Sequence, residues 1–130
     1  MGRYVLRIIL RIFLLIFTTL CLSGCPAMFY GHIQNNSNSK ILVVPEHNSK
    51  NVWSIESNQN IEVIWFQNCI AIQRNDSMQY FQSWPVPDNI VTNGIFSSSL
   101  NATYNEQGLF FVTVKGDLIQ VPKIKQCKNT

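Results

Sequence analysis

After position 25, apolar residues come in short runs, without the spacing of three and four that marks an amphipathic helix. The runs are rich in β-branched and aromatic residues and are broken by Asn, Gly, Ser and Pro, a pattern typical of strands and turns. Strands are predicted over residues 29–34, 41–44, 52–56, 61–66, 69–74, 79–84, 95–100, 110–114 and 118–121. Short strands at intervals of about ten residues, without long crossovers, indicate an all-β fold: a small antiparallel β-sandwich, or alternatively a small β-barrel.

Turns are expected where residues that tolerate a positive φ, or that bond to their own backbone, are clustered. These positions are 35–38, 58–60, 75–77, 93–94, 105–108 and 115–117. Alternation within the strands predicts which side chains are buried. Ile61, Val63 and Trp65 are expected on the inner face of one strand, and Val112 and Val114 on the inner face of another.

The first 24 residues have a different pattern. Arg3, Arg7 and Arg11 precede an apolar stretch over 12–22, and the small pair Ser23 and Gly24 follows. This arrangement is typical of a signal peptide helix. A spanning helix needs about 20 apolar residues, roughly twice this stretch. An uncleaved membrane anchor that extends back past the arginines is the alternative.

The four residues 22–25 read LSGC and resemble the lipobox of bacterial lipoproteins. In that family the cysteine thiol receives a diacylglyceryl group, and the peptide bond before it is then cut. Small residues before the cut fit a narrow protease groove, and a thiolate is the nucleophile that forms the thioether. Cys21 follows the bulky Leu20 and does not fit the pattern. The resemblance implies a signal peptide over 1–24 and a lipidated Cys25 that begins a single mature domain, 25–130.

The resemblance also implies acyl chains such as palmitate and a place in the cell envelope. Each buried CH₂ contributes about 0.8 kcal/mol, so three acyl chains would hold the protein at the membrane permanently. Pro26 stands where an Asp would retain an enteric-type lipoprotein in the inner membrane, which favours the outer membrane, facing the periplasm. The tether to the first strand is very short, so the domain should lie close to the bilayer. Residues 28–30 are expected to enter that strand; resting in the membrane interface is the alternative.

Charge argues against nucleic acid as a partner. The whole chain of 130 residues has a formal charge of +3, from ten Lys and Arg and seven Asp and Glu. Three of the ten basic residues are the arginines of the leader, so seven remain against seven acidic residues after it. A mature domain with no net charge lacks the basic surface that phosphate binding needs.

Two cysteines, Cys69 and Cys127, remain after the lipobox. An exported chain meets an oxidising compartment, where an even pair of cysteines most simply forms a disulfide. Such a bond would fix the C-terminal tail to a central strand. A buried Cys69 and an unpaired Cys127 are the alternative.

Candidate chemistry is sparse. His32 and His47 are not in the close pairs that zinc sites usually show, the carboxylates are scattered, and no nucleophile elbow or phosphate-binding glycine loop is present. We therefore expect no enzyme activity, no cofactor and no bound metal.

One stretch combines aromatic residues with a proline-rich loop. It contains Tyr80, Phe81, Trp84, Pro85 and Pro87. Aromatic side chains are enriched at binding hot spots, and prolines reduce the entropy lost on binding, so this stretch is a candidate partner surface. A core strand that leads into a stiff loop is the alternative interpretation. The function expected overall is a non-catalytic binding or assembly module of the cell envelope with a protein partner; the second hypothesis is an inhibitor or immunity-type lipoprotein directed against an enzyme or toxin.

Overall fold

The structure is a computed structural model that describes residues 5, 7–9, 11–13, 28–45, 51–65, 68–94 and 97–127. The described residues before position 14 are helical. Within the described part of the chain, no helix is long and apolar enough to cross a membrane. From position 28 onward, the described residues form β-strands, the turns and loops between them, and one short 3-10 helix, η1 (Asp88–Ile90).

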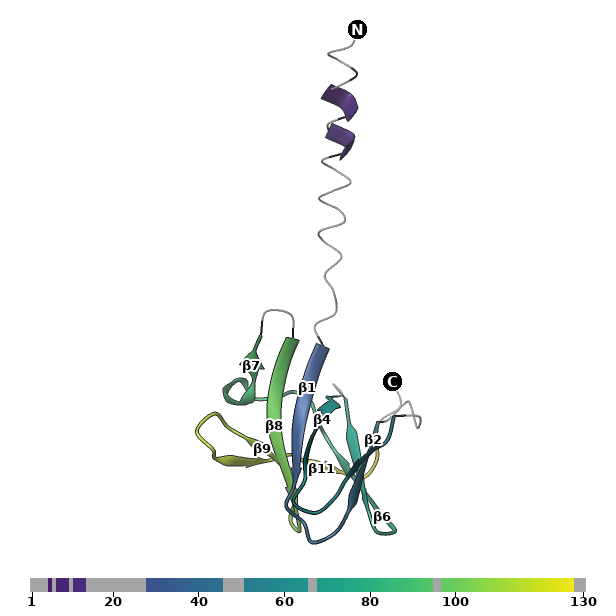
Figure 1. Ribbon diagram of the computed structural model, residues 1–130, viewed down its shortest axis with the longest axis vertical. Helices are drawn as coiled ribbons and strands as arrows, with labels where there is room; N and C mark the ends of the chain where they lie inside the picture. Colours follow the sequence, from purple (N-terminus) through teal and green to yellow (C-terminus); the bar gives the residue numbers. More distant parts are fainter. Residues whose placement is uncertain are drawn as a thin grey trace.

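The strands form two sheets that pack face to face (Figure 1). Among the described residues, the first sheet has the order β10-β9-β8-β1-β4, with β7 paired to β8, and the second has the order β11-β6-β5-β2-β3. The first sheet contains β1 (Met28–Asn35), β4 (Asn60–Ile64), β7 (Thr92–Asn93), β8 (Ser97–Asn105), β9 (Gly108–Val112) and β10 (Leu118–Gln120). The second contains β2 (Ile41–Pro45), β3 (Trp53–Ile55), β5 (Ile70–Arg74), β6 (Ser77–Phe81) and β11 (Lys123–Ile124). The predicted small β-sandwich is confirmed.

The pairing of β1 with β8 departs from the predicted antiparallel arrangement. These two strands run parallel over their length, from Met28 opposite Ser97 to Asn35 opposite Tyr104 (Figure 1). The other pairs between described strands are antiparallel. Parallel strands need a long connection, and here the chain crosses to the second sheet and returns between them. No local turn signal marks such a pair, so periodicity did not predict it.

Alternation places one side of each sheet in the core. On β4, Val63 is buried, Ile61 is half-buried and Glu62 is exposed, as predicted, and Trp65 just beyond the strand is buried. The core cluster consists of Ile33, Ile41, Val43, Ile55, Val63, Trp65, Ile70, Ile72, Phe81, Ile90, Leu100, Ala102, Tyr104, Leu109, Phe111 and Val121. Both sheets contribute to it, so the sandwich has one continuous core.

The predicted inner face of β9 is wrong. Phe111 and Thr113 are buried, whereas Val112 is only half-buried and Val114 is 73% exposed. Thr113 can point inward because its Oγ1 accepts a hydrogen bond from the backbone N–H of Asp117 at 3.0 Å, in the turn before β10. Because the Thr113 hydroxyl has this partner, the face that carries both Thr113 and the large apolar ring of Phe111 can be buried.

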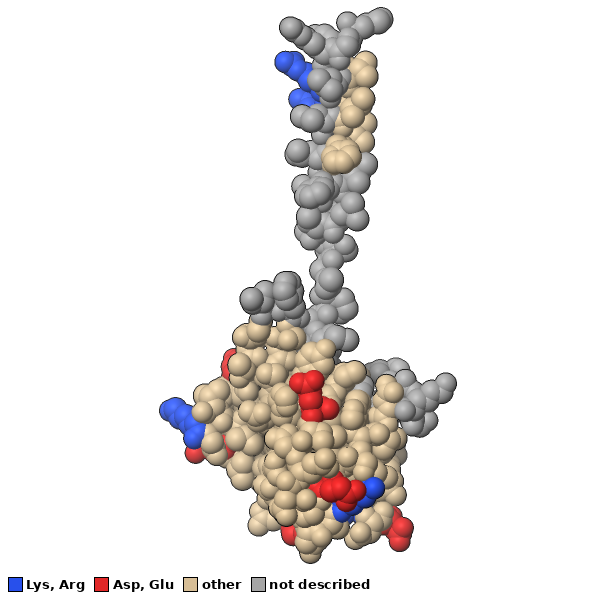
Figure 2. Space-filling model, in the orientation of Figure 1, with Lys and Arg blue, Asp and Glu red and all other residues tan. Residues whose placement is uncertain are grey.

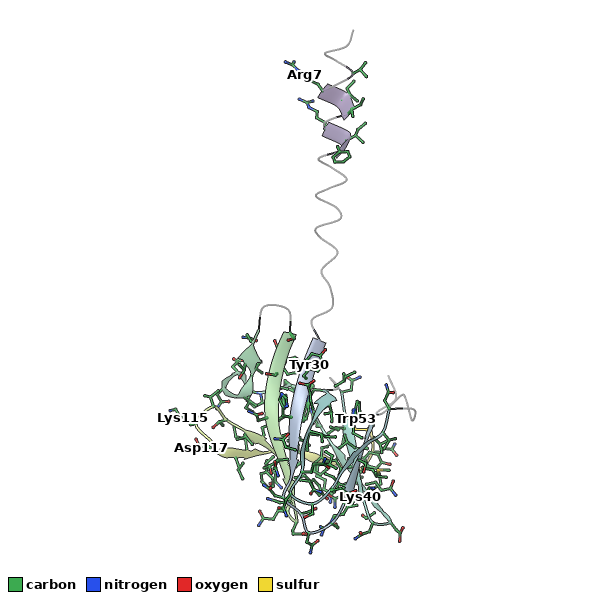
Figure 3. All side chains as sticks on the ribbon, viewed as in Figure 1. Arg7, Tyr30, Lys40, Trp53, Lys115 and Asp117 are labelled. Carbon is green, nitrogen blue, oxygen red and sulfur yellow. A yellow bond between two sulfur atoms is a disulfide. The ribbon has the colours of Figure 1, made fainter. Side chains whose placement is uncertain are left out.

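The sandwich has two ends, which we call the entry end and the far end. The entry end is where β1 begins and β4 and β6 end, and the far end contains the turns at 36–40, 56–59, 75–76 and 106–107. Figure 3 shows Tyr30 near the start of β1 and Lys40 at the opposite end. Positive φ at Asn58, Asn75 and Gly108 confirms three of the predicted turns at this end.

Candidate anchor and binding surfaces

Cys25, the predicted lipidation site, lies outside the described residues. The structure does fix where the fold begins after it: β1 starts at Met28. Consecutive Cα atoms are 3.8 Å apart, so the Cα of Cys25 can be at most about 11 Å from that of Met28. Any lipid on Cys25 is therefore held close to the entry end. Residues 28–30 belong to β1, which confirms that they enter the first strand, and the ring of Phe29 packs against the core.

Trp84 stands at the entry end beside Phe29. Their ring centroids are 5.9 Å apart in an edge-to-face arrangement, and Trp84 is 40% exposed. The backbone around it is fixed on both sides. The indole N–H of Trp65 donates to the carbonyl oxygen of Ser83 at 3.1 Å, and Nε2 of Gln82 donates to the carbonyl oxygen of Trp84 at 3.1 Å. The structure thus presents a large aromatic side chain to solvent on a well-held loop.

The candidate partner surface is divided by the fold. Phe81 is 1% exposed and packs edge to face against Tyr104, so it cannot contact a partner. Its inward position follows from the alternation of β6, and for this residue the core-strand interpretation is correct. Trp84 and Pro85 are exposed, while Tyr80 and Pro87 are half-buried. The exposed part of the predicted surface is therefore the loop at the entry end.

A shallow groove lies between β6 and β11. Its volume is about 450 Å³, and it is lined by Met78, Gln79, Tyr80, Lys123, Ile124 and Lys125. Tyr80 is the member of the candidate partner surface that reaches it. The two lysines make its rim basic.

Cys69 and Cys127 form a disulfide, as predicted. Their Cα atoms are 5.6 Å apart, and 58 positions separate them in the sequence. Cys69 is 2% exposed and comes directly before β5, a central strand of the second sheet. The bond therefore fixes the end of the described chain to the core of the domain.

The far end is organised around Asn35, which is fully buried. Its side-chain amide nitrogen donates to the carbonyl oxygens of Ser39 at 2.8 Å and Ile55 at 3.0 Å. Its Oδ1 accepts from the backbone N–H of Ser37 at 3.0 Å and from the Ser37 hydroxyl at 2.7 Å. A buried amide with this many partners holds the turn after β1 and the end of β3 in one arrangement.

Arg74 adds a second set of bonds between far-end turns. Its Nε donates to Oγ of Ser39 at 2.8 Å and its Nη2 to Oδ1 of Asn38 at 2.7 Å, and its Nη1 forms an ion pair with the carboxylate of Glu106. Glu106 also accepts a hydrogen bond from the backbone N–H of Asn38 at 3.3 Å. Arg74 ends β5 and Glu106 follows β8, so this cluster joins the two sheets.

The bonds of this cluster shift its acid–base equilibria. The hydrogen bond from Arg74 is the main reason why the pKa of Glu106 is below its ordinary value, and the same bond raises the pKa of Arg74. Burial raises the pKa of the Tyr104 phenol, while the nearby guanidinium of Arg74 acts in the opposite direction. The cluster is therefore a fixed ion pair over a neutral phenol at neutral pH.

Sequence reasoning did not single out Asn35, Arg74 or Glu106. Two of them lie in predicted turns, and Arg74 directly precedes a predicted turn, which gave each a sufficient local explanation. Only the folding of distant turns onto one end brings them together.

The histidines show no catalytic arrangement in the described part of the chain. Nε2 of His32 is 3.5 Å from Oε2 of Glu62 across the outer face of β1 and β4, and both side chains are partly exposed. His47 lies outside the described residues. No group of three or more His, Cys, Asp or Glu side chains among the residues that the structure describes could hold a metal ion.

No protein-family model, curated protein or solved structure matches this chain. The function proposed below therefore rests on the residues and geometry of the chain itself.

Proposed function

We propose that this chain is a lipid-anchored, non-catalytic binding module of the bacterial cell envelope. The LSGC motif supports the anchor, and acylation at Cys25 would hold the entry end at a membrane. Pro26, in place of an Asp after the cysteine, supports the outer membrane with the domain facing the periplasm. In this arrangement the far end points away from the membrane, toward other envelope proteins.

The binding role is proposed because the turns of the far end are joined by hydrogen bonds. Asn35 and Arg74 hold turns from both sheets in one arrangement through hydrogen bonds to side chains and backbone. A surface that is already ordered loses little conformational entropy when a partner binds, so rigid turns favour recognition. Around them, exposed polar residues such as Asn36, Asp76 and Gln107 supply hydrogen-bonding groups.

The anchor is tested by Cys25→Ser in the full chain, expressed in bacteria. We expect the wild type to carry acyl chains by mass spectrometry and to run as the shorter mature protein, while the variant lacks acyl chains and keeps precursor length. Cys21→Ser is the matched control and should be processed like the wild type. An unchanged size and membrane fraction of the Cys25 variant would show that the leader is an uncleaved anchor.

The binding role is tested by photo-cross-linking in intact envelopes. A photoreactive residue at Asp76 or Gln107 samples the far end, and one at Val114, which is 73% exposed, samples a flank as the control. We expect a discrete cross-linked protein from the far-end positions and none from Val114. Equal products from all three positions, or none at all, would contradict a far-end binding surface.

A further inference from the structure

We infer that the entry end rests on the lipid surface itself, with the indole of Trp84 in the headgroup region of the bilayer. This inference depends on the proposed acylation of Cys25 and adds a second, non-covalent contact with the membrane. It assigns a ligand, a phospholipid surface, to the exposed part of the aromatic, proline-rich stretch.

Distance limits how far Trp84 can be from the lipid. Phe29 is four residues after Cys25, so their Cα atoms are at most about 15 Å apart. The ring of Trp84 lies 5.9 Å from the ring of Phe29. The polar region on each side of the hydrocarbon core is several ångströms deep, and the short connection allows Trp84 to reach that region while Cys25 is anchored.

The exposed side chains at this end have the right chemistry. Besides Trp84, Val52 is 42% exposed next to the start of β3, and Ile64 is 39% exposed at the end of β4, opposite Tyr30. Trp and Tyr are the residues enriched at membrane interfaces, where an apolar ring and a polar N–H or O–H are both accommodated. Burial of these apolar groups against lipid is favourable, whereas their exposure to water is not.

Charged pairs are concentrated at the other end. The ion pair between Arg74 and Glu106, and that between Lys40 and Glu56 at 3.2 Å, both lie among the far-end turns. On the face drawn in Figure 2, the Lys and Arg side chains of the sandwich lie at its flank and its lower end, away from the start of β1, while acidic side chains also lie in its upper part. Transfer of ionised groups toward lipid is costly, so this distribution favours the entry end as the membrane-facing one.

The loop also holds Trp84 in a fixed position. The hydrogen bond from Trp65 to Ser83, the one from Gln82 to the Trp84 carbonyl, and the ring contact with Phe29 all orient it. A membrane contact through this residue would therefore set the angle of the whole sandwich and direct the far end away from the bilayer.

Fluorescence quenching by lipid tests the inference. The acylated full-length product is purified from bacteria and reconstituted in vesicles of phosphatidylethanolamine and phosphatidylglycerol, with or without lipid brominated near the top of the acyl chains. Trp84→Phe keeps an aromatic ring beside Phe29, so the difference between wild type and variant isolates Trp84. We expect brominated lipid to quench most of the fluorescence by which the wild type exceeds the Trp84→Phe variant.

A matched control places tryptophan at the far end. Met78 is 38% exposed near the β5–β6 turn, and Met78→Trp in the Trp84→Phe background should be insensitive to brominated lipid. Equal quenching at both positions, or none at Trp84 in acylated protein that floats with the vesicles, would overturn the lipid contact and leave the proposed anchor standing. Absence of acyl chains by mass spectrometry would instead overturn the anchor and, with it, this inference.

Discussion

Gly31 lies directly against the indole ring of Trp65. A Cβ at position 31 would overlap Cε3 of the ring and stand 3.2 Å from Cζ3. Trp65 is 3% exposed and also contacts Phe111, with ring centroids 5.7 Å apart. The space that a side chain at this position of β1 would fill is therefore occupied by the ring of Trp65, the residue directly after β4.

Gly31→Ala should destabilise the fold because the indole would have to move against packed neighbours. We expect a loss of about 2 kcal/mol in the free energy of unfolding, measured by urea denaturation. The same substitution in a Trp65→Leu background should cost much less, because the overlapping ring is gone. Equal costs in both backgrounds would show that the ring contact does not set the requirement for glycine.

Asn35→Ala should be among the most damaging changes at the far end. It removes the partners of the Ser39 and Ile55 carbonyls and of the Ser37 N–H from a buried site. We expect the free energy of unfolding to fall by about 3 kcal/mol, because buried polar groups would lose their hydrogen-bond partners without regaining water. Asn105→Ala, which removes one exposed hydrogen bond to the Gln107 N–H, is the control and should cost about 0.5 kcal/mol or less. Similar costs would contradict the central position of Asn35.

Reduction of the Cys69–Cys127 disulfide should lower stability by about 4 kcal/mol. The bond closes a loop of 58 positions, and loss of that constraint enlarges the unfolded ensemble. Denaturation midpoints with and without reductant measure the effect. The double variant Cys69→Ser and Cys127→Ser should match the reduced wild type and be indifferent to reductant. A midpoint that does not move on reduction would contradict this prediction.

The Arg74–Glu106 pair should make stability depend on acid. Because the pKa of Glu106 is lowered in the fold from an ordinary 4.5, its contribution is complete above about pH 4.5 and is lost as pH falls toward the folded-state value. The midpoint temperature of thermal unfolding should therefore fall less steeply below this pH for Glu106→Gln than for the wild type. Identical acid profiles would mean that the pair contributes no pH-dependent stability.

The sequence predicted most strand positions because alternating residues and turn chemistry are local. Asn58 and Asn75 have the positive φ that their turns required, and the strands around them lie within a few residues of the predicted bounds. The strand predicted over 95–100 instead continues to Asn105, because its partners β1 and β9 extend it on both sides. The short β7 and β11 were not predicted, since two residues carry no periodicity.

The candidate surfaces were only partly predictable. The disulfide was predicted from the cysteine count and the expectation of an oxidising compartment, without knowledge of the fold. The sequence did not show that Phe81 is buried and Trp84 exposed, because this difference depends on where the strand ends and the loop begins. The Arg74 cluster depends on contacts across more than 30 positions, which no local pattern encodes.

The parallel pairing of β1 with β8 also constrains the order of folding. The chain is synthesised from its N-terminus, so of its two partner strands β1 can pair only with β4 until residues 97–105 have been made. The side of β1 that pairs with β8 therefore stays open for most of synthesis. Contacts between residues this distant in sequence form slowly, because closing the long loop between them costs entropy before the contacts contribute any stabilisation. Folding must wait for the C-terminal third of the chain, so a truncation before β8 would remove the first strand's second neighbour as well as the last strands.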